Sequence, residues 1–205
     1  MDELSGTKEN IFDTFIEMTS SLGYENVSMR DIAEKVGIKV ASIYNHFESK
    51  ERILECVYDY YEERQYDNRK SADEMKKMIE TAGVDELLRT FFFTFVSEDQ
   101  KKYVRMVLIT KIIYMRLFQD PIANAMFTRN NLNNAEYVTG VMKHGIEIGR
   151  LDSSFDIETF ADVLIGSMII MGIKAFSGAD YKVGQLDQEE RILALLARLL
   201  ATALK

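Results

Sequence analysis

Proline is almost absent from this chain, where Pro121 is the single one among 205 residues. Eleven glycines add few further positions for tight turns. A protein built from β-strands needs many short segments joined by Gly- and Pro-rich turns, which this composition does not supply. Long stretches without proline instead carry apolar residues at the spacing of a helix face. We therefore predict an all-α protein.

The length allows one or two domains with a sizeable core, and 47% apolar and 28% charged residues are ordinary for a globular protein. Cys56 is the only cysteine, which excludes an intrachain disulfide and fits a reducing compartment. The polar, acidic start lacks the apolar segment of a secretion signal. The longest near-apolar run, 163–173, spans about 16 Å as a helix, whereas a bilayer core is about 30 Å thick. We expect a cytoplasmic protein with no membrane partner.

Four helices are predicted in the first part of the chain. The first runs for about sixteen residues from Thr7 to a stop at Gly23. Its apolar stripe comprises Ile11, Phe12, Phe15, Ile16, Met18 and Leu22. Ser28 and Asp31 have the approximate spacing of a capping box that opens the second helix, and Gly37 ends that helix.

The third predicted helix, 39–47, is very short and follows a turn with glycine, as in a helix-turn-helix. One of its faces is expected to point inward and carries Val40, Ile43 and Phe47. Another face carries hydrogen-bonding groups with little apolar bulk: Lys39, Ser42 and His46, with Asn45 beside them. Such a face can reach base edges and phosphates in a major groove. Ser49 is expected to cap the fourth helix, which places Lys50 at a helix N-terminus, a natural phosphate site.

The rest of the chain also has helical periodicity. Further helices are predicted at 84–96, 101–118, 121–149, 156–176 and 186–204. We expect a helix-turn-helix domain at 1–52 and a larger helical domain at 53–205. The fourth helix links the two domains, with the boundary region near the polar segment 67–77.

Several motifs of the first part occur together at a defined spacing. They are Gly23-Tyr24, Ser28, Arg30, Ile32-Ala33, Val36-Gly37, Ser42-Ile43-Tyr44, Phe47 and Ser49-Lys50. In this combination residues 7–54, about a quarter of the chain, resemble the N-terminal domain of the TetR family of bacterial transcriptional regulators. The resemblance implies an N-terminal three-helix DNA-binding domain followed by a larger helical domain for ligand binding and dimerisation.

The resemblance also assigns expected roles to individual residues. Phosphate contacts are implied for Ser42, Tyr44 and Lys50. Base contacts are implied for Lys39, Val40, Ala41, Asn45 and His46, with Ser28 and Arg30 at the start of the second helix. The alternative interpretation of Tyr44 is a core tyrosine with an exposed hydroxyl, and that of His46 is a surface histidine.

Net charge departs from the pattern of strongly basic DNA-binding proteins. The chain carries −8, and its first 70 residues hold nine Lys and Arg against fifteen Asp and Glu. Between residues 28 and 50 the balance is four against three. Many family members have a basic N-terminal arm, but here Asp2 and Glu3 occupy it. DNA binding is therefore expected to rest on locally placed donors, with modest nonspecific affinity and a shallow salt dependence.

The larger domain is rich in Met and Phe, which form core by default and also line adaptable apolar pockets. The expected effector pocket comprises Phe92, Phe95, Tyr103, Met106, Tyr114, Asn134 and Tyr137, with Arg105 as a further polar anchor. The expected effector is a largely apolar small molecule. His144 lacks a partner at metal-ligand spacing, and Cys56 reads as a packing residue, so no metal or cofactor is expected.

The last two predicted helices are more apolar than one contact face requires. The helix at 156–176 is apolar on every side, and 186–204 carries a wide leucine stripe. Both are expected to pack against a two-fold mate, with Gly166 and Ser167 at a close crossing.

The resulting hypothesis is a homodimeric repressor that an effector releases from a palindromic operator in double-stranded DNA. The alternatives are a DNA-binding protein without an effector, linked to nucleoid organisation or division, and a helical enzyme that retains a helix-turn-helix. Neither HExxH, GxSxG nor GxGxxG occurs, which argues against the enzyme.

Overall fold

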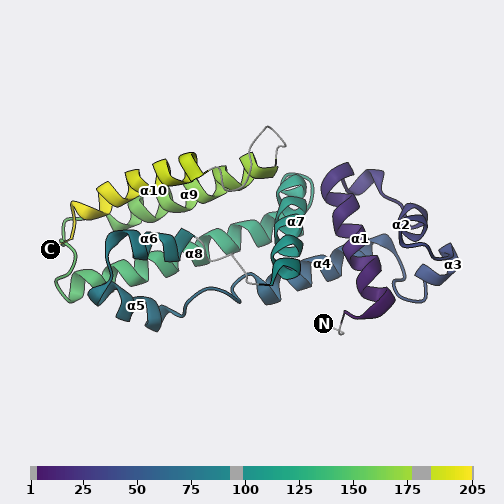
Figure 1. The fold of residues 1–205 in the computed structure, drawn as a ribbon, viewed down its shortest axis with the longest axis horizontal. Helices are drawn as coiled ribbons and strands as arrows, with labels where there is room; N and C mark the ends of the chain where they lie inside the picture. The colour runs from purple at the N-terminus through teal and green to yellow at the C-terminus, as the bar shows by residue number, and fades with distance from the viewer. Residues whose placement is uncertain (1–3, 93–98, 177–185, 205) are drawn as a thin grey trace. The chain divides into compact units, whose positions relative to one another are not determined.

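The computed structural model describes residues 4–92, 99–176 and 186–204, and over these ranges it is helical and contains no β-strand (Figure 1). The all-α prediction is confirmed. The elements are α1 (Gly6–Leu22), the 3-10 turn η1 (Tyr24–Asn26), α2 (Met29–Val36), α3 (Val40–Ile43), α4 (Lys50–Arg64), α5 (Ala72–Thr81), α6 (Val84–Phe92), α7 (Gln100–Arg116), α8 (Pro121–Glu147), α9 (Ile157–Phe176) and α10 (Leu186–Ala201).

The chain forms two compact units, each with its own apolar core. The first unit contains residues 1–67 and 95–127, and the second contains 68–94 and 128–205. The break at 67–68 coincides with the start of the polar segment 67–77. The helix-turn-helix domain expected at 1–52 lies wholly within the first unit, and its functional boundary with 53–205 stays a prediction.

The core of the first unit joins the predicted helix-turn-helix to α4 and α7. Phe12 and Phe15 of α1 are fully buried in it. They share the cluster with Ile32, Ile43, Ile53 and Val57 from α2 to α4, and with Ile109, Ile112 and Ile113 from α7. The predicted stripe of α1 is wrong at its end, because Leu22 is 54% exposed one residue before the helix stops at Gly23.

Local hydrogen bonds set the ends of α2 and α3. The Ser28 Oγ accepts a bond from the Asp31 N–H at 3.2 Å, and the Asp31 carboxylate accepts one from the Ser28 N–H at 2.9 Å. This capping box is the predicted one, and Gly37 ends α2 with a φ of 79° in the left-handed region. The α-helical part of α3 is shorter than predicted, since the chain continues as turns from residue 44 to residue 46.

Helix α5 begins within the polar segment 67–77, for which the sequence predicts a domain boundary and no helix. Ser71 and Glu74 form a second capping box at its start, and it buries only Met75 and Ile79. The predicted helix at 84–96 is described as far as Phe92, and its last residues lie outside the described ranges.

The second unit packs α5, α6, α8, α9 and α10 around a separate core. Leu164 of α9 and Leu196 and Leu200 of α10 are buried in it. The same two helices leave a set of large apolar side chains exposed: Val163, Ile170, Ile173, Leu195 and Leu199. Within the described ranges, no helix combines the length and apolar character needed to cross a bilayer.

Candidate nucleic-acid interface

The segment 39–47, which contains α3, is held by two buried side chains. Ile43 is fully buried and Phe47 is 3% exposed, so both anchor the segment in the core of the first unit. The Phe47 N–H donates to the Ile43 carbonyl at 3.0 Å, which keeps the turns after α3 compact. Because the segment 39–47 rests on these two residues, most of its other side chains are exposed.

The exposed side of this segment carries most of the predicted DNA contacts. Lys39, Ala41, Asn45 and His46 are exposed, Tyr44 is 51% exposed, and Ser42 is half-buried. The prediction that Val40 faces inward is wrong, since 41% of this residue is exposed. Val40 is the first residue of α3 and follows the exposed N-cap residue Lys39. Val40 therefore joins the exposed set, where its isopropyl group is available for apolar contact.

Two predicted residues lie at the start of α2. Arg30 is exposed in the first turn of the helix. The Ser28 hydroxyl accepts from the Asp31 N–H, so its first role is to start α2. Hydrogen bonds from the Ser28 hydroxyl and N–H lower the pKa of the Asp31 carboxyl, which keeps the cap charged.

Lys50, predicted to face phosphate, is turned toward Tyr24. Its Nζ donates to the Tyr24 carbonyl at 2.9 Å and lies 3.9 Å from the centroid of the same ring. The Tyr24 hydroxyl donates to Glu51 Oε1 at 3.0 Å, and the Arg116 guanidinium lies 4.2 Å from the ring centroid. Burial, followed by the bond to Glu51, raises the pKa of Tyr24. The ammonium of Lys50 therefore already has partners within its own unit.

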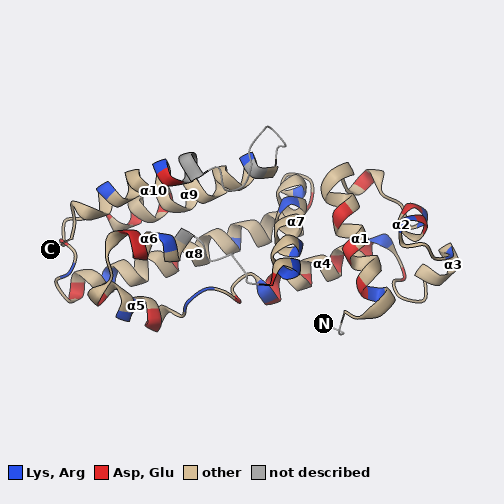
Figure 2. Cartoon of the chain, viewed as in Figure 1, with Lys and Arg blue, Asp and Glu red and all other residues tan. Residues whose placement is uncertain are grey.

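Helices α1, α2 and α4 each carry charges of both signs, drawn in blue and red in Figure 2. Lys39 and Arg30 are interspersed with acidic residues. The candidate interface consequently presents local hydrogen-bond donors rather than a broad basic field, which agrees with the charge count of the sequence.

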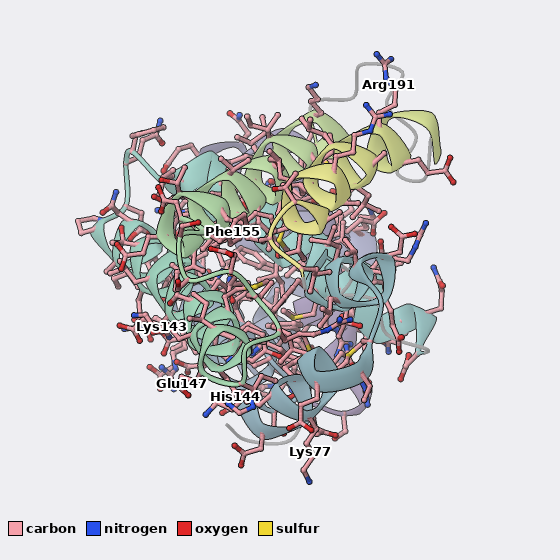
Figure 3. All side chains as sticks on the ribbon, turned by 90° about the vertical axis from the view of Figure 1, so that its left-hand side faces the viewer. Lys77, Lys143, His144, Glu147, Phe155 and Arg191 are labelled. Carbon is pink, nitrogen blue, oxygen red and sulfur yellow. The ribbon has the colours of Figure 1, made fainter. Side chains whose placement is uncertain are left out.

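Cys56 and His144 have structural surroundings. Burial raises the pKa of the Cys56 thiol, which disfavours the reactive thiolate. His144 of α8 lies 3.7 Å from Glu80 and 3.8 Å from Glu147, the latter on the same helix (Figure 3). Among the described side chains, no group of three or more His, Cys, Asp or Glu is placed to hold a metal ion.

The predicted effector residues are divided between the units. Tyr103, Met106 and Tyr114 belong to the first unit, and Asn134 and Tyr137 to the second. Phe95 lies outside the described residues, as does the side chain of Phe92. The pocket assignment therefore stays a prediction.

Three of these residues already have partners within their own unit. The Tyr114 ring packs edge-on against Phe127, with 5.4 Å between centroids, and burial raises its pKa to about 12. The Tyr137 hydroxyl donates to the Lys70 carbonyl at 2.7 Å. The Asn134 Oδ1 accepts from Arg69 Nη1 at 3.2 Å.

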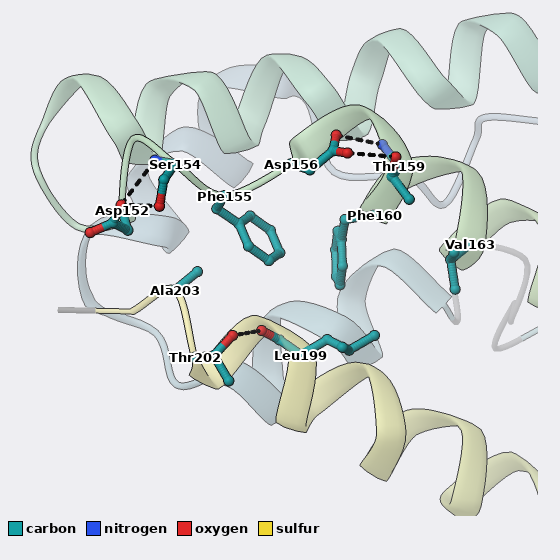
Figure 4. A pocket seen from close by; sticks show the side chains of 10 residues that line it. All are labelled: Asp152, Ser154, Phe155, Asp156, Thr159, Phe160, Val163, Leu199, Thr202 and Ala203. Carbon is teal, nitrogen blue, oxygen red and sulfur yellow. Dashed lines mark hydrogen bonds between the residues drawn. The ribbon is translucent and has the colours of Figure 1, made fainter.

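A cleft of about 530 Å³ in the second unit was not predicted (Figure 4). It lies between the start of α9 and the end of α10, and Phe155, Phe160 and Leu199 face it. Asp156 at its rim accepts from the Thr159 N–H at 3.0 Å and the Thr159 hydroxyl at 2.7 Å. None of the residues predicted for the effector pocket lines it.

The helix-turn-helix geometry agrees with comparisons to known proteins. Residues 11–57 match the sequence profile of bacterial regulatory proteins of the tetR family. Over 103 residues the chain is 33% identical to IcaR of Staphylococcus aureus, the negative transcriptional regulator of the biofilm operon icaADBC. That match covers 48% of this chain and 50% of IcaR, so the chain spans about half the length of this curated relative.

Solved structures share the fold at low sequence identity. A TetR-family regulator from Cytophaga hutchinsonii superposes with a TM-score of 0.64 at 16% identity, over 99% of this chain and 98% of the other. A complex of SmeT with triclosan gives a TM-score of 0.64 at 17% identity, over 98% and 93%. Residues 11–57 thus carry the N-terminal domain of the tetR family of bacterial regulatory proteins.

Proposed function

We propose that the chain is a transcriptional repressor that acts in the cytoplasm as a two-fold dimer on a palindromic operator. The observation that carries this proposal is the exposed side of α3, which presents polar side chains outward from a TetR-family domain. The relative IcaR, a negative regulator, supports repression as the direction of control.

The proposed contacts divide by chemistry. Ser42 and Tyr44 donate to phosphates, and Lys50 joins them once its ammonium leaves Tyr24. Lys39, Asn45, His46 and Arg30 contact base edges. Ser28 supports these contacts through the cap that it forms at the start of α2. Val40 and Ala41 offer apolar contact, suited to a thymine methyl group.

The proposed dimer uses α9 and α10. Their exposed apolar residues, Val163, Ile170, Ile173, Leu195 and Leu199, would be covered by the same residues of a second copy, as a two-fold interface requires. Gly166 supports close approach, since nothing lies within 4 Å of where its Cβ would be.

The proposed effector is a largely apolar small molecule that binds the larger helical domain. The Met- and Phe-rich composition of that domain supports this, and a TetR-like fold has been solved with triclosan bound. Effector binding must then lower the affinity for the operator by the same factor by which operator binding lowers the affinity for the effector. The usual coupling free energy is about 1–3 kcal/mol.

Gel-shift titration of alanine variants tests the DNA interface. The probes are a palindromic duplex selected from a random-sequence library and an unrelated duplex of equal length. Asn45→Ala and Lys39→Ala should narrow the affinity ratio between the two duplexes, because each lost base contact removes about 1–3 kcal/mol of discrimination. Lys143→Ala removes an exposed charge of the second unit and is the matched control.

Lys50→Ala should weaken both duplexes by the same factor. The salt slope should fall by about one per lost phosphate contact, hence about two per dimer. If the Asn45, Lys39 and Lys50 variants all bind the selected duplex like the wild type, α3 is not the helix that recognises DNA.

A further inference from the structure

Helix α7 shares the core of the DNA-binding helices. Its most buried residues, Ile109, Ile112 and Ile113, lie in one cluster with the side chains that anchor α3. The described helices that pack most closely on α1 include α7, and both belong to the first unit. We call this unit the head: helices α1 to α4, α7 and the start of α8, as far as Phe127.

Arg105 fastens the first half of α7 to α1. Its Nε and Nη2 donate to the two carboxylate oxygens of Asp13 at 2.8 and 2.9 Å, and Nη2 also donates to Glu9 Oε1 at 2.7 Å. The Arg105 side chain is only 9% exposed, and its guanidinium carbon lies 5.3 Å from the centroid of the Tyr60 ring. A planar fork with two parallel bonds fixes orientation as well as distance. Arg105 therefore resists rotation of α7 about its own axis.

Arg116 fastens the other end of α7. Its Nε and Nη2 donate to Asp120 Oδ2 at 3.1 and 3.0 Å, and its guanidinium stacks on Tyr24 beside α2. The Tyr58 hydroxyl of α4 donates to the same Asp120 oxygen at 2.7 Å. Asp120 Oδ1 accepts from the Ile122 N–H at 2.9 Å at the start of α8. One carboxylate thus joins α4, α7 and α8.

The two arginines project from the same side of α7. They are eleven residues apart, close to three helical turns or about 16 Å. A single anchor leaves a helix free to pivot, whereas two anchors on one side fix its direction against the surface that it contacts. Helix α8 begins at Pro121, next to Asp120, and continues without a break to Glu147, past the limit of the head at Phe127.

We propose that Arg105 and Arg116 are positioning residues for DNA binding, which lock α7 to the helix-turn-helix and so fix the separation of the two recognition helices in the dimer. This inference rests on the proposed dimeric, DNA-binding function. The head that moves as one body then includes residues 99–127, and not residues 1–52 alone. Neither arginine contacts DNA in this scheme.

Fixing the separation matters only when both heads bind at once. A second head that is correctly placed binds at high effective concentration, which strengthens two-site binding by about 10²–10⁴-fold over one site. If α7 is no longer held against α1, the second head occupies more positions relative to the first. Its effective concentration at the second half-site then falls, and part of the gain in two-site affinity is lost. Binding of one head to one half-site depends on the exposed residues of α2, α3 and α4 within that head and keeps its strength.

The test compares a selected palindrome with a duplex that contains one half-site. Arg105→Met and Arg116→Met should lower the affinity for the palindrome by about tenfold or more while the half-site affinity stays within about twofold. Lys101→Met is the matched control for Arg105, because Lys101 pairs with Glu9 at 2.8 Å but is 60% exposed. It should leave both affinities within about twofold. Arg105→Lys, which keeps the charge and loses the fork, should fall between the wild type and Arg105→Met.

Distances between the heads provide a readout that does not use DNA. Spin labels on Glu48→Cys in a Cys56→Ser background should give one narrow distance distribution in the dimer, which Arg105→Met broadens and Lys101→Met does not. Asp13→Asn serves in place of Arg105→Met if that variant does not fold. Equal loss of palindrome and half-site binding, or an unchanged distribution, overturns the inference. A wild type that does not prefer its selected palindrome overturns the proposed function instead.

Discussion

Gly145 of α8 occupies a position without room for a side chain. An added Cβ would lie 2.7 Å from Ile79 Cδ1 and 2.9 Å from Leu151 Cδ1. Both neighbours are buried, at 0% and 1% exposure, so neither side chain can swing out to make space. Glycine is otherwise unfavourable within a helix, by about 1 kcal/mol relative to alanine. Close packing of α8 on α5 therefore explains this residue.

Gly145→Ala should lower the free energy of unfolding. Overpacking a core costs about 1–3 kcal/mol, which exceeds the gain in helix propensity of about 1 kcal/mol and leaves a net loss on the order of 1 kcal/mol. Gly140→Ala in the same helix is the matched control, because nothing lies within 4 Å of its added Cβ, and it should be stabilising. Urea unfolding followed by circular dichroism measures both. A stabilised Gly145→Ala would show that α5 and α8 separate easily.

Arg105 is an example of a residue whose ion-pair partners cannot be predicted from the sequence. It reads from sequence as a polar anchor for an effector, yet its partners Asp13 and Glu9 lie 92 and 96 positions earlier in the chain. Spacing along one helix carries no information about such pairs. The exposure of Lys39 and Asn45 beside α3 is predictable from sequence, because local helical spacing around the buried Ile43 sets which side each residue takes.

At the scale of elements, α5 and α3 differed most from expectation. Helix α5 has only Met75 and Ile79 on its buried side, which is too few apolar residues to show a period among its charged neighbours. The Ser71 and Glu74 pair was nonetheless the same signature that correctly marked the start of α2 at Ser28. A capping signal can therefore indicate the start of a helix even where the apolar pattern is too weak to predict it.

The cap of α5 should make the stability of the chain depend on pH. The hydrogen bonds from Ser71 lower the pKa of Glu74 from its ordinary value of 4.5. A carboxyl whose folded pKa is lowered stabilises the fold above its ordinary pKa and loses that contribution as the pH falls through the folded value. Stability should therefore decline below about pH 4.5 as this cap is protonated.

Ser71→Ala isolates this contribution. Loss of the serine cap should cost about 1 kcal/mol at pH 7, and the gap from the wild type should shrink by pH 3 as Glu74 becomes protonated. Urea titrations at both pH values measure the gap. Thr81→Ala, at the other end of α5, should show no such pH dependence. A gap that is equal at both pH values would mean that the carboxylate of Glu74 adds nothing to the cap.

At the scale of the whole molecule, the predicted partners depend on exposed surfaces. The sequence indicates the apolar helices, and the fold shows which of their side chains are exposed. The leucine stripe at 186–204 divides into buried Leu196 and Leu200 and exposed Leu195 and Leu199. This division follows from packing against the second core, which periodicity alone cannot resolve. The effector pocket stays a prediction, and the residues expected to line it come from both compact units.

Leu195→Glu should convert the proposed dimer to a monomer, because it places a charge within the apolar surface of α9 and α10, and an unpaired buried charge is costly. Leu132→Glu is the matched control: the same substitution on α8, at 60% exposure against 57% for Leu195. Sedimentation at micromolar concentration should show a dimer for the control and a monomer for Leu195→Glu. A Leu195→Glu dimer would place the interface elsewhere.

The same pair of variants separates assembly from head positioning. Leu195→Glu should lose palindrome affinity in a manner that protein concentration restores, because dimer formation then limits binding. Arg105→Met should remain a dimer, and its loss should persist at any protein concentration, because its heads are joined but no longer held at a fixed separation. Half-site affinity should match the wild type in both variants, since α3 is intact in each. Sedimentation and gel shifts on the same samples distinguish the two mechanisms, and a loss in Arg105→Met that vanishes at high protein concentration would assign that arginine to assembly.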